Sequence, residues 1–345
     1  MTALPDPALP DLAVPLDLPP MESEPVADLP AGRGWQFEPK WDGFRALAFR
    51  DRAAVALQSR HQRPLGRYFP ELLEHLAGLP VERFVLDGEI VVEGGGPDGF
   101  AALQLRLHPA ASRVARLAAG QPATFVAFDL LVDGSGRPLL DAPLAERRAA
   151  LEAFVAAIGG DGPRLRLSPA VASAAAARRW LDRLGPGIDG IVAKRRDLPY
   201  QPGERAMLKW KPKRTVDCVV AGIYRKDDAG RLESLLLGLY DPAGLLHYVG
   251  RVPVGRADPA LEARLAPLVG GAGAGFTGRA PGGPSRWSAR RRRPVPLRPV
   301  LVAEVAADQV TGERFRHPAR LLRWRDDKPP SACSLDQLRR PRKAD

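Results

Sequence analysis

The stretch Phe37-Glu38-Pro39-Lys40-Trp41-Asp42-Gly43-Phe44-Arg45-Ala46 decides how the rest of this chain is interpreted. It places one lysine directly before an Asp-Gly pair, and Asp-Gly pairs favour turns. We therefore expect residues 34–49 to form a strand pair, or a strand and a turn, around Lys40.

The composition is that of a globular protein with a polyanionic partner. The chain has 345 residues, enough for two domains, and is 45% hydrophobic and 26% charged. No apolar run is long enough to cross a membrane, and residues 1–32 contain no Lys or Arg, which argues against a signal peptide. Cys218 and Cys333 predict reduced thiols in a cytoplasmic protein. The net charge of +11 favours nucleic acid first and an anionic membrane second.

Changes in texture along the chain divide it into three parts. Residues 1–32 are Pro-rich and acidic, and we expect an extended tail without a core of its own. Residues 33–215 mix apolar strands with amphipathic helices, which we expect near residues 70–76, 141–158 and 173–184. Residues 216–345 contain short strands separated by Gly, Pro and Asp, which predict a small β-barrel.

Six further short patterns follow Lys40 in order. They are Ser59-Arg60, Asp87-Gly88-Glu89, Phe128-Asp129, Asp189-Gly190-Ile191-Val192-Ala193-Lys194, Leu208-Lys209-Trp210-Lys211 and Arg325-Asp326-Asp327-Lys328. Each is weak alone, but the ordered set resembles the motifs of the covalent nucleotidyltransferases. The chain is most similar to the small bacterial ATP-dependent DNA ligases of type C and to the ligase domain of type D.

This resemblance implies a fold and an activity. The fold class is α+β: an ATP-grasp-like nucleotidyltransferase domain of antiparallel sheets and helices, followed by a C-terminal OB-fold β-barrel. The implied activity is ATP-dependent sealing of 5′-phosphate, 3′-hydroxyl nicks in duplex DNA through a lysyl-AMP intermediate, in DNA repair. The implied protein is a cytoplasmic monomer whose partner is nicked duplex DNA.

The resemblance also assigns roles to residues. Lys40 is the implied nucleophile, Phe128 the aromatic that stacks on the nucleobase, and Glu89 the contact to the ribose. The implied nucleotide-binding residues are Glu38, Arg45, Arg60, Glu89, Phe128, Lys194, Lys209, Lys211, Arg325 and Lys328.

The residue chemistry supports these roles independently. A free lysine has a pKa of about 10.4 and needs neighbouring cations or partial burial to become a good nucleophile at neutral pH. Glu89 and Asp189 are acids in apolar strands, and a buried carboxylate is costly unless it is paired or binds a metal. We therefore expect both to bind Mg²⁺, with Mn²⁺ as the alternative ion. A structural salt bridge from Asp189 to Lys194 or Arg195 is the competing interpretation.

Other interpretations stay open at this stage. The motif around Lys40 does not separate a DNA ligase from an RNA ligase or a GTP-using capping enzyme. A basic nucleic-acid-binding module without catalytic activity is a further alternative. The arginine run at residues 290–293 either contacts a phosphate backbone or lies in a solvated loop.

Overall fold

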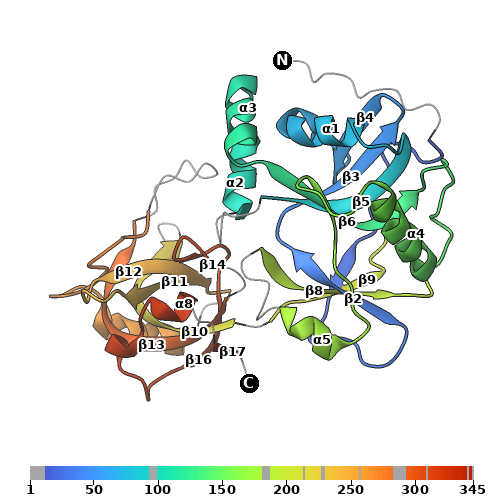
Figure 1. Cartoon of the computed structure of the whole chain (residues 1–345). Coiled ribbons are helices and arrows are strands. Elements are labelled where there is room, and N and C mark those ends of the chain that lie inside the picture. The colour runs from blue at the N-terminus through green and yellow to red at the C-terminus, as the bar shows by residue number, and fades with distance from the viewer. Residues whose placement is uncertain are drawn as a thin grey trace. The chain divides into compact units, whose positions relative to one another are not determined.

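The computed structural model describes residues 12–92, 99–180, 187–212, 214–226, 230–255, 258–282, 293–307, 310–339 and 342–343. The chain divides into two compact units, Met1–Lys211 and Pro212–Asp345 (Figure 1). The sequence placed its boundary at residues 215/216. Most of the arginine run at residues 290–293 lies outside the described residues, so its two interpretations stay open.

The first unit contains a five-stranded sheet in the order β4-β3-β5-β6-β7. Its strands are β3 (Phe44–Asp51), β4 (Ala54–Ser59), β5 (Arg83–Val92), β6 (Ala123–Val132) and β7 (Leu165–Leu167). Every residue of β6 is buried, which explains its nearly continuous apolar sequence. Helices α1 (Pro70–Ala77) and α4 (Leu144–Ala157) contribute Leu72 and Phe154 to one core with β5 and β6. Helices α2 (Gly99–Arg106) and α3 (Ala111–Gly120) were not predicted from the sequence.

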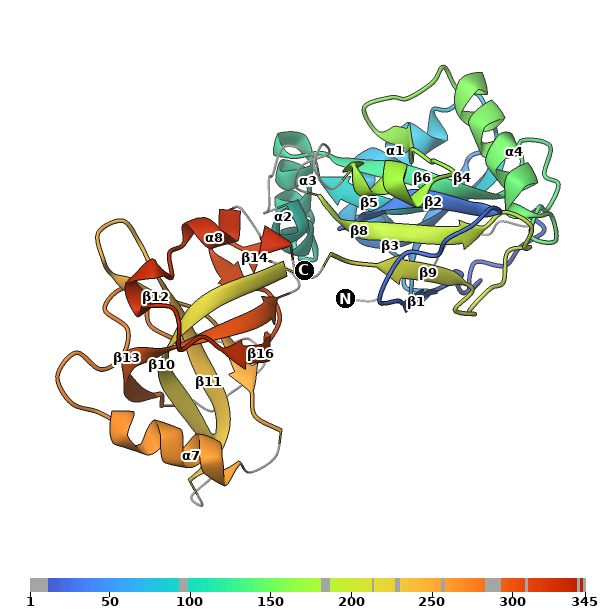
Figure 2. The ribbon, with the colours of Figure 1, turned by 90° about the horizontal axis from the view of Figure 1, so that it is seen from below.

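A second sheet of the same unit has the order β1-β9-β8-β2, as Figure 2 shows from another side. It consists of β1 (Ser23–Pro25), β2 (Trp35–Trp41), β8 (Ile188–Arg195) and β9 (Met207–Trp210). Helix α5 (Ala174–Arg178) packs Ala177 into a core with β2 and β8. Because β2 runs directly into β3 through the turn at Asp42 and Gly43, the stretch around Lys40 joins the two sheets.

The expectation that residues 1–32 form an extended tail without a core needs correction. Within its described part, Val14, Leu18 and Met21 are buried in a core that also contains residues of β3, β5, β6 and β9. Strand β1 pairs in parallel with β9. The prolines keep this segment out of helices, but its apolar residues cover a face of the sheet that would otherwise meet water. Residues 1–11 lie outside the described residues.

The second unit is built on a sheet ordered β12-β11-β10-β13-β16, with β17 paired to β10. Its strands are β10 (Arg214–Lys226), β11 (Arg231–Tyr240), β12 (Leu246–Pro253), β13 (Val295–Ala307), β16 (Arg320–Trp324) and β17 (Arg342–Lys343). The smaller elements are α7 (Pro259–Leu265), α8 (Asp336–Arg339) and the strand pair β14 (Val310–Thr311) and β15 (Arg314–Phe315). Apolar side chains of β10, β11, β12 and β13 form its core.

Two details of the expected architecture need correction. The sheets of the first unit are mixed rather than purely antiparallel, because β1 pairs with β9 and β6 pairs with β7 in parallel. In the second unit, strand pairing among the described residues does not close into a barrel. The α+β class is confirmed.

Candidate active site

Lys40 lies at the end of β2 and is held by a carboxylate from the neighbouring strand. Strand β2 pairs with β8 so that Lys40 lies opposite Gly190, which brings the preceding Asp189 close to the lysine. Lys40 Nζ lies 2.9 Å from Asp189 Oδ1, and Lys211 Nζ lies 2.7 Å from Asp189 Oδ2. The ion pair with Asp189 positions the Lys40 amine. The Lys40 side chain is still 24% exposed, so a substrate can reach it.

These contacts correct the competing interpretation of Asp189. Neither Lys194 nor Arg195 pairs with it in the structure. Arg195 instead pairs with Asp197 at 2.6 Å, and Lys194 pairs with Glu38 at 3.0 Å. Asp189 therefore belongs to the surroundings of Lys40.

Glu89 approaches the same place from β5. Its Oε1 accepts a hydrogen bond from the Gly43 N–H at 3.1 Å, and strand pairing places it opposite Arg45. Burial is the main cause that raises the pKa of Glu89 to about 7; the positive charges of Lys40 and Arg45 oppose this rise, and the negative charge of Asp189 adds a smaller part of it. Glu89 and Asp189 are therefore two acids close enough to repel each other.

Arg45 is fixed by an acid that the sequence-based assignment left out. Its Nε and Nη2 atoms donate to the two carboxylate oxygens of Asp87, each at 2.6 Å. Asp87 is fully buried and also accepts a hydrogen bond from the Tyr200 hydroxyl at 2.7 Å. The Arg45 guanidinium carbon lies 4.5 Å from the centre of the Phe128 ring. Asp87 thus orients Arg45 against this ring.

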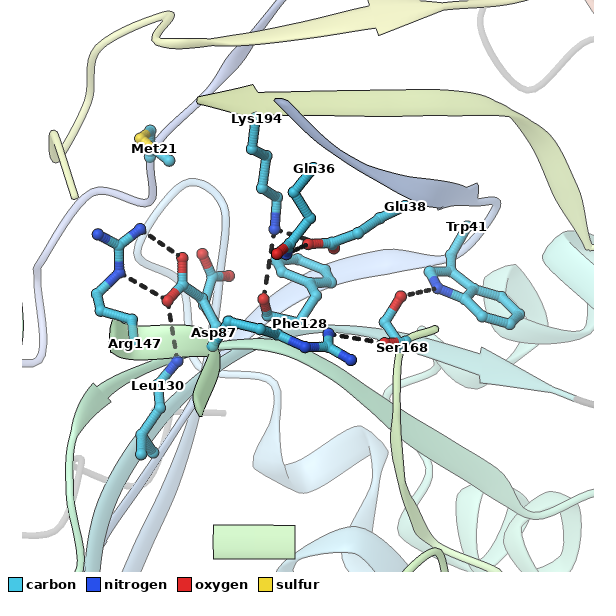
Figure 3. A network of polar contacts seen from close by, with 12 residues as sticks. Met21, Gln36, Glu38, Trp41, Asp87, Phe128, Leu130, Arg147, Ser168 and Lys194 are labelled. Carbon is cyan, nitrogen blue, oxygen red and sulfur yellow. Dashed lines mark hydrogen bonds and ion pairs between the residues drawn. The ribbon is translucent and has the colours of Figure 1, made fainter. Parts of the chain in front are cut away.

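A buried ion pair lies beside the same aromatic ring (Figure 3). Lys194 Nζ donates to Glu38 Oε2 at 3.0 Å and to the Phe128 carbonyl oxygen at 3.3 Å. It also lies 4.5 Å from the centre of the Phe128 ring, while the Gln36 amide donates to Glu38 Oε1 at 2.8 Å. Phe128 is 8% exposed and its ring has two cations near the π system, so base stacking on Phe128 stays a prediction.

The remaining residues that the sequence predicted to bind the nucleotide lie at three separate places in the chain. Lys209 lies close enough to Lys40 and Lys211 for their positive charges, together with burial, to lower its pKa. Arg60 lies in the turn after β4, where its guanidinium contacts His61 at 3.2 Å. Arg325 and Lys328 lie in the second unit and pair with Asp217.

The glycines of the Asp-Gly pairs are required by close strand packing. A Cβ atom added to Gly43 would lie 2.2 Å from the Ile90 carbonyl oxygen. At Gly88 the corresponding distance to the Val126 carbonyl oxygen is 2.6 Å, and at Gly190 the distance to the Trp210 carbonyl oxygen is 2.3 Å. No side chain fits there without moving a neighbouring strand, so these glycines set the positions of Glu89 and Asp189.

Comparisons with known proteins identify the family. The family profile "ATP dependent DNA ligase domain" matches residues 20–211, and "ATP dependent DNA ligase C terminal region" matches residues 228–328. DNA ligase C2 of Mycolicibacterium smegmatis is 46% identical, with 93% of this chain and 94% of the relative covered. DNA ligase C of Mycobacterium tuberculosis is 42% identical, with 93% and 94% covered.

A solved structure supports the fold alone. It is described as "DNA binding with a minimal scaffold: Structure-function analysis of Lig E DNA ligases". It is 17% identical, covers 88% of this chain and 100% of its own, and has a TM-score of 0.51. Within the described residues, no helix is both long and apolar enough to cross a membrane. With its adenylation domain followed by a C-terminal OB domain, the chain belongs to the ATP-dependent DNA ligase family.

Proposed function

We propose that this chain seals nicks between a 5′-phosphate and a 3′-hydroxyl in duplex DNA, as a cytoplasmic, monomeric DNA-repair enzyme that carries AMP on Lys40. The observation that supports this most strongly is the position of the Lys40 amine. Asp189 fixes it at 2.9 Å, Lys211 shares the same carboxylate, and the side chain is still accessible. The family shown by the comparisons favours this activity over RNA joining and over capping.

The proposed chemistry starts at Lys40 Nζ. Its amine loses a proton and attacks the α-phosphorus of ATP, so that an N–P bond forms and the P–O bond to pyrophosphate breaks. An oxygen of the nick's 5′-phosphate then attacks the phosphorus of this AMP, so that a P–O bond forms and the N–P bond to Lys40 breaks. The 3′-hydroxyl attacks that phosphate, forms the phosphodiester bond and releases AMP. Lys209 and Lys211 would stabilise the negative charge of the phosphate groups during the first step.

The two acids of this site fit a divalent cation. Glu89 lies on β5 and Asp189 on β8, and the two are close enough for the charge of Asp189 to raise the pKa of Glu89. In the described parts of the chain, no three metal-ligating side chains gather at one place. Mg²⁺ commonly takes one or two carboxylates and completes its shell with water and substrate phosphates, so two acids suffice. The ion would supply positive charge to the phosphate oxygens.

The remaining contacts are proposed by position. Glu38, Lys194 and Phe128 form one buried group that would bind the adenosine part of ATP. Arg45, already aligned by Asp87, extends this group. Arg60 would contact the nucleotide from its exposed turn. Arg325 and Lys328 would bind the leaving pyrophosphate, because cations there favour departure of that group.

The decisive experiment is covalent labelling. The protein is incubated with α-labelled ATP and Mg²⁺ and separated by denaturing electrophoresis, with Lys40→Ala as the variant and Lys226→Ala as the control. We expect an acid-labile, hydroxylamine-sensitive label on the wild type and on Lys226→Ala only. Label that persists on Lys40→Ala would overturn the assignment. Parallel reactions with GTP, and with nicked RNA in place of DNA, distinguish the other nucleotidyltransferases.

A further inference from the structure

Arg325 and Lys328 share one buried carboxylate. Arg325 follows β16, and the Lys328 N–H donates to the Arg325 carbonyl oxygen at 3.2 Å, so a tight turn brings the two side chains together. Arg325 Nη1 lies 3.1 and 3.2 Å from the two oxygens of Asp217, and Lys328 Nζ donates to Asp217 Oδ2 at 2.8 Å. One acid therefore determines where both cations lie.

Asp217 is itself held firmly. It lies on β10, and its side chain is only 4% exposed. The Gln337 side chain, from α8, accepts from the Asp217 N–H at 3.1 Å and donates to the Asp217 carbonyl oxygen at 3.0 Å. Two hydrogen bonds thus fix its backbone, and two cations fix its carboxylate. Such a chain of contacts fixes the orientation of the groups at its end.

The second carboxylate on Arg325 is of a different kind. Asp327 accepts from Arg325 Nε and Nη2 at 2.8 Å each, but its side chain is 66% exposed. An incoming phosphate can replace an exposed acid at small cost, because water already competes for that contact. Replacing buried Asp217 would instead leave an unpaired charge in the interior. Asp217 is therefore the partner that stays, and the Nε–Nη2 edge of Arg325 is the part that can exchange.

We infer that Asp217 is a positioning residue for self-adenylylation, which aligns Arg325 and Lys328 for the triphosphate of ATP. The inference rests on the proposed function of those two cations. Asp217 does not contact the substrate; it acts through the cations. This role explains why an aspartate is buried in β10 between Val216 and Cys218, which both belong to the apolar core.

The test compares Asp217→Asn with Glu262→Gln. Glu262 is an acid of the same unit whose ion pair, at 3.1 Å, is with Arg225, so it serves as the control. Three quantities are measured: the rate of self-adenylylation, the sealing of a pre-adenylylated nick and the melting temperature. We expect Asp217→Asn to lower adenylylation by about tenfold or more, with sealing of the pre-adenylylated nick close to wild type. Equal losses in both reactions, or an unchanged adenylylation rate, would overturn the inference.

A mutant cycle separates positioning from folding. If Asp217 acts through Arg325 and Lys328, then Asp217→Asn added to the Arg325→Ala, Lys328→Ala protein should lower adenylylation no further than those two substitutions alone. Additive losses would show that Asp217 acts by another route and would overturn the inference. The single variants Arg325→Ala and Lys328→Ala test the proposed function itself. Defects in these two variants, with wild-type behaviour of Asp217→Asn, would leave that function standing and remove only the inference.

Discussion

Loss of the Lys194 amine should destabilise the first unit strongly, because it leaves the Glu38 carboxylate buried without its cation. The side chains of this pair are 4% and 2% exposed, and the Nζ–Oε2 distance is 3.0 Å. Removing one partner of a buried ion pair costs about 3–5 kcal/mol. In a domain of this size each kcal/mol corresponds to about 2–4 °C in melting temperature. Lys194→Met should therefore lower the melting temperature by roughly 6–20 °C.

The assay is thermal and urea unfolding of the full chain, monitored by circular dichroism. Arg195→Met is the matched control, because its pair with Asp197 is exposed and is worth only about 0–1 kcal/mol. The double variant Glu38→Gln, Lys194→Met removes both charges and should recover much of the loss. A Lys194→Met protein within about 1 kcal/mol of wild type would refute the reasoning. So would a double variant that is no more stable than Lys194→Met.

Three other predictions concern the surroundings of Lys40. The pKa of Glu89 is about 7 in the folded chain against an ordinary 4.5, so the folded chain keeps this proton to a higher pH than the unfolded chain does. Without nucleotide and divalent ions, stability should fall as pH rises from about 4.5 to 7, by up to about 3 kcal/mol, and urea unfolding of Glu89→Gln should lack this dependence. Gly88→Ala should cost about 1–3 kcal/mol in the same assay, because its Cβ would lie 2.4 Å from the Phe125 ring; a neutral effect would contradict that packing. Asp189→Asn should slow covalent labelling by about 100-fold, because it loosens Lys40, and a wild-type rate would refute this role.

Much of the first unit was predictable because its signals are local. The apolar run with two acids became β5, and the amphipathic segment at residues 70–76 became α1. Helix α2 was missed because its packing depends on a distant partner. Arg106 near its end is buried and forms an ion pair with Glu71 of α1, which nothing in its own segment indicates. The pairing of β1 with β9 depends on contacts between equally distant segments.

The side-chain pairings at the candidate site could not be predicted from the sequence. The sequence pointed to Arg45 and Asp87 as separate motif residues, but only the register of β3 and β5 makes them partners. The same holds for Tyr200, which reaches Asp87 from far along the chain. Asp217 carries no motif signal at all; its only sign in the sequence is an acid within an apolar strand.

The two pairings that strand geometry adds follow one rule. Asp189 joins Lys40 to Lys211, and Asp217 joins Arg325 to Lys328. Two cations side by side would repel each other and diverge into solvent, whereas one largely buried carboxylate between them holds both, and these three groups together carry a net charge of about +1. That residual charge favours a phosphate, and the fixed geometry avoids reorganisation when the phosphate arrives. A buried acid between two motif cations therefore prepares each set of cations for an anionic substrate instead of cancelling its charge.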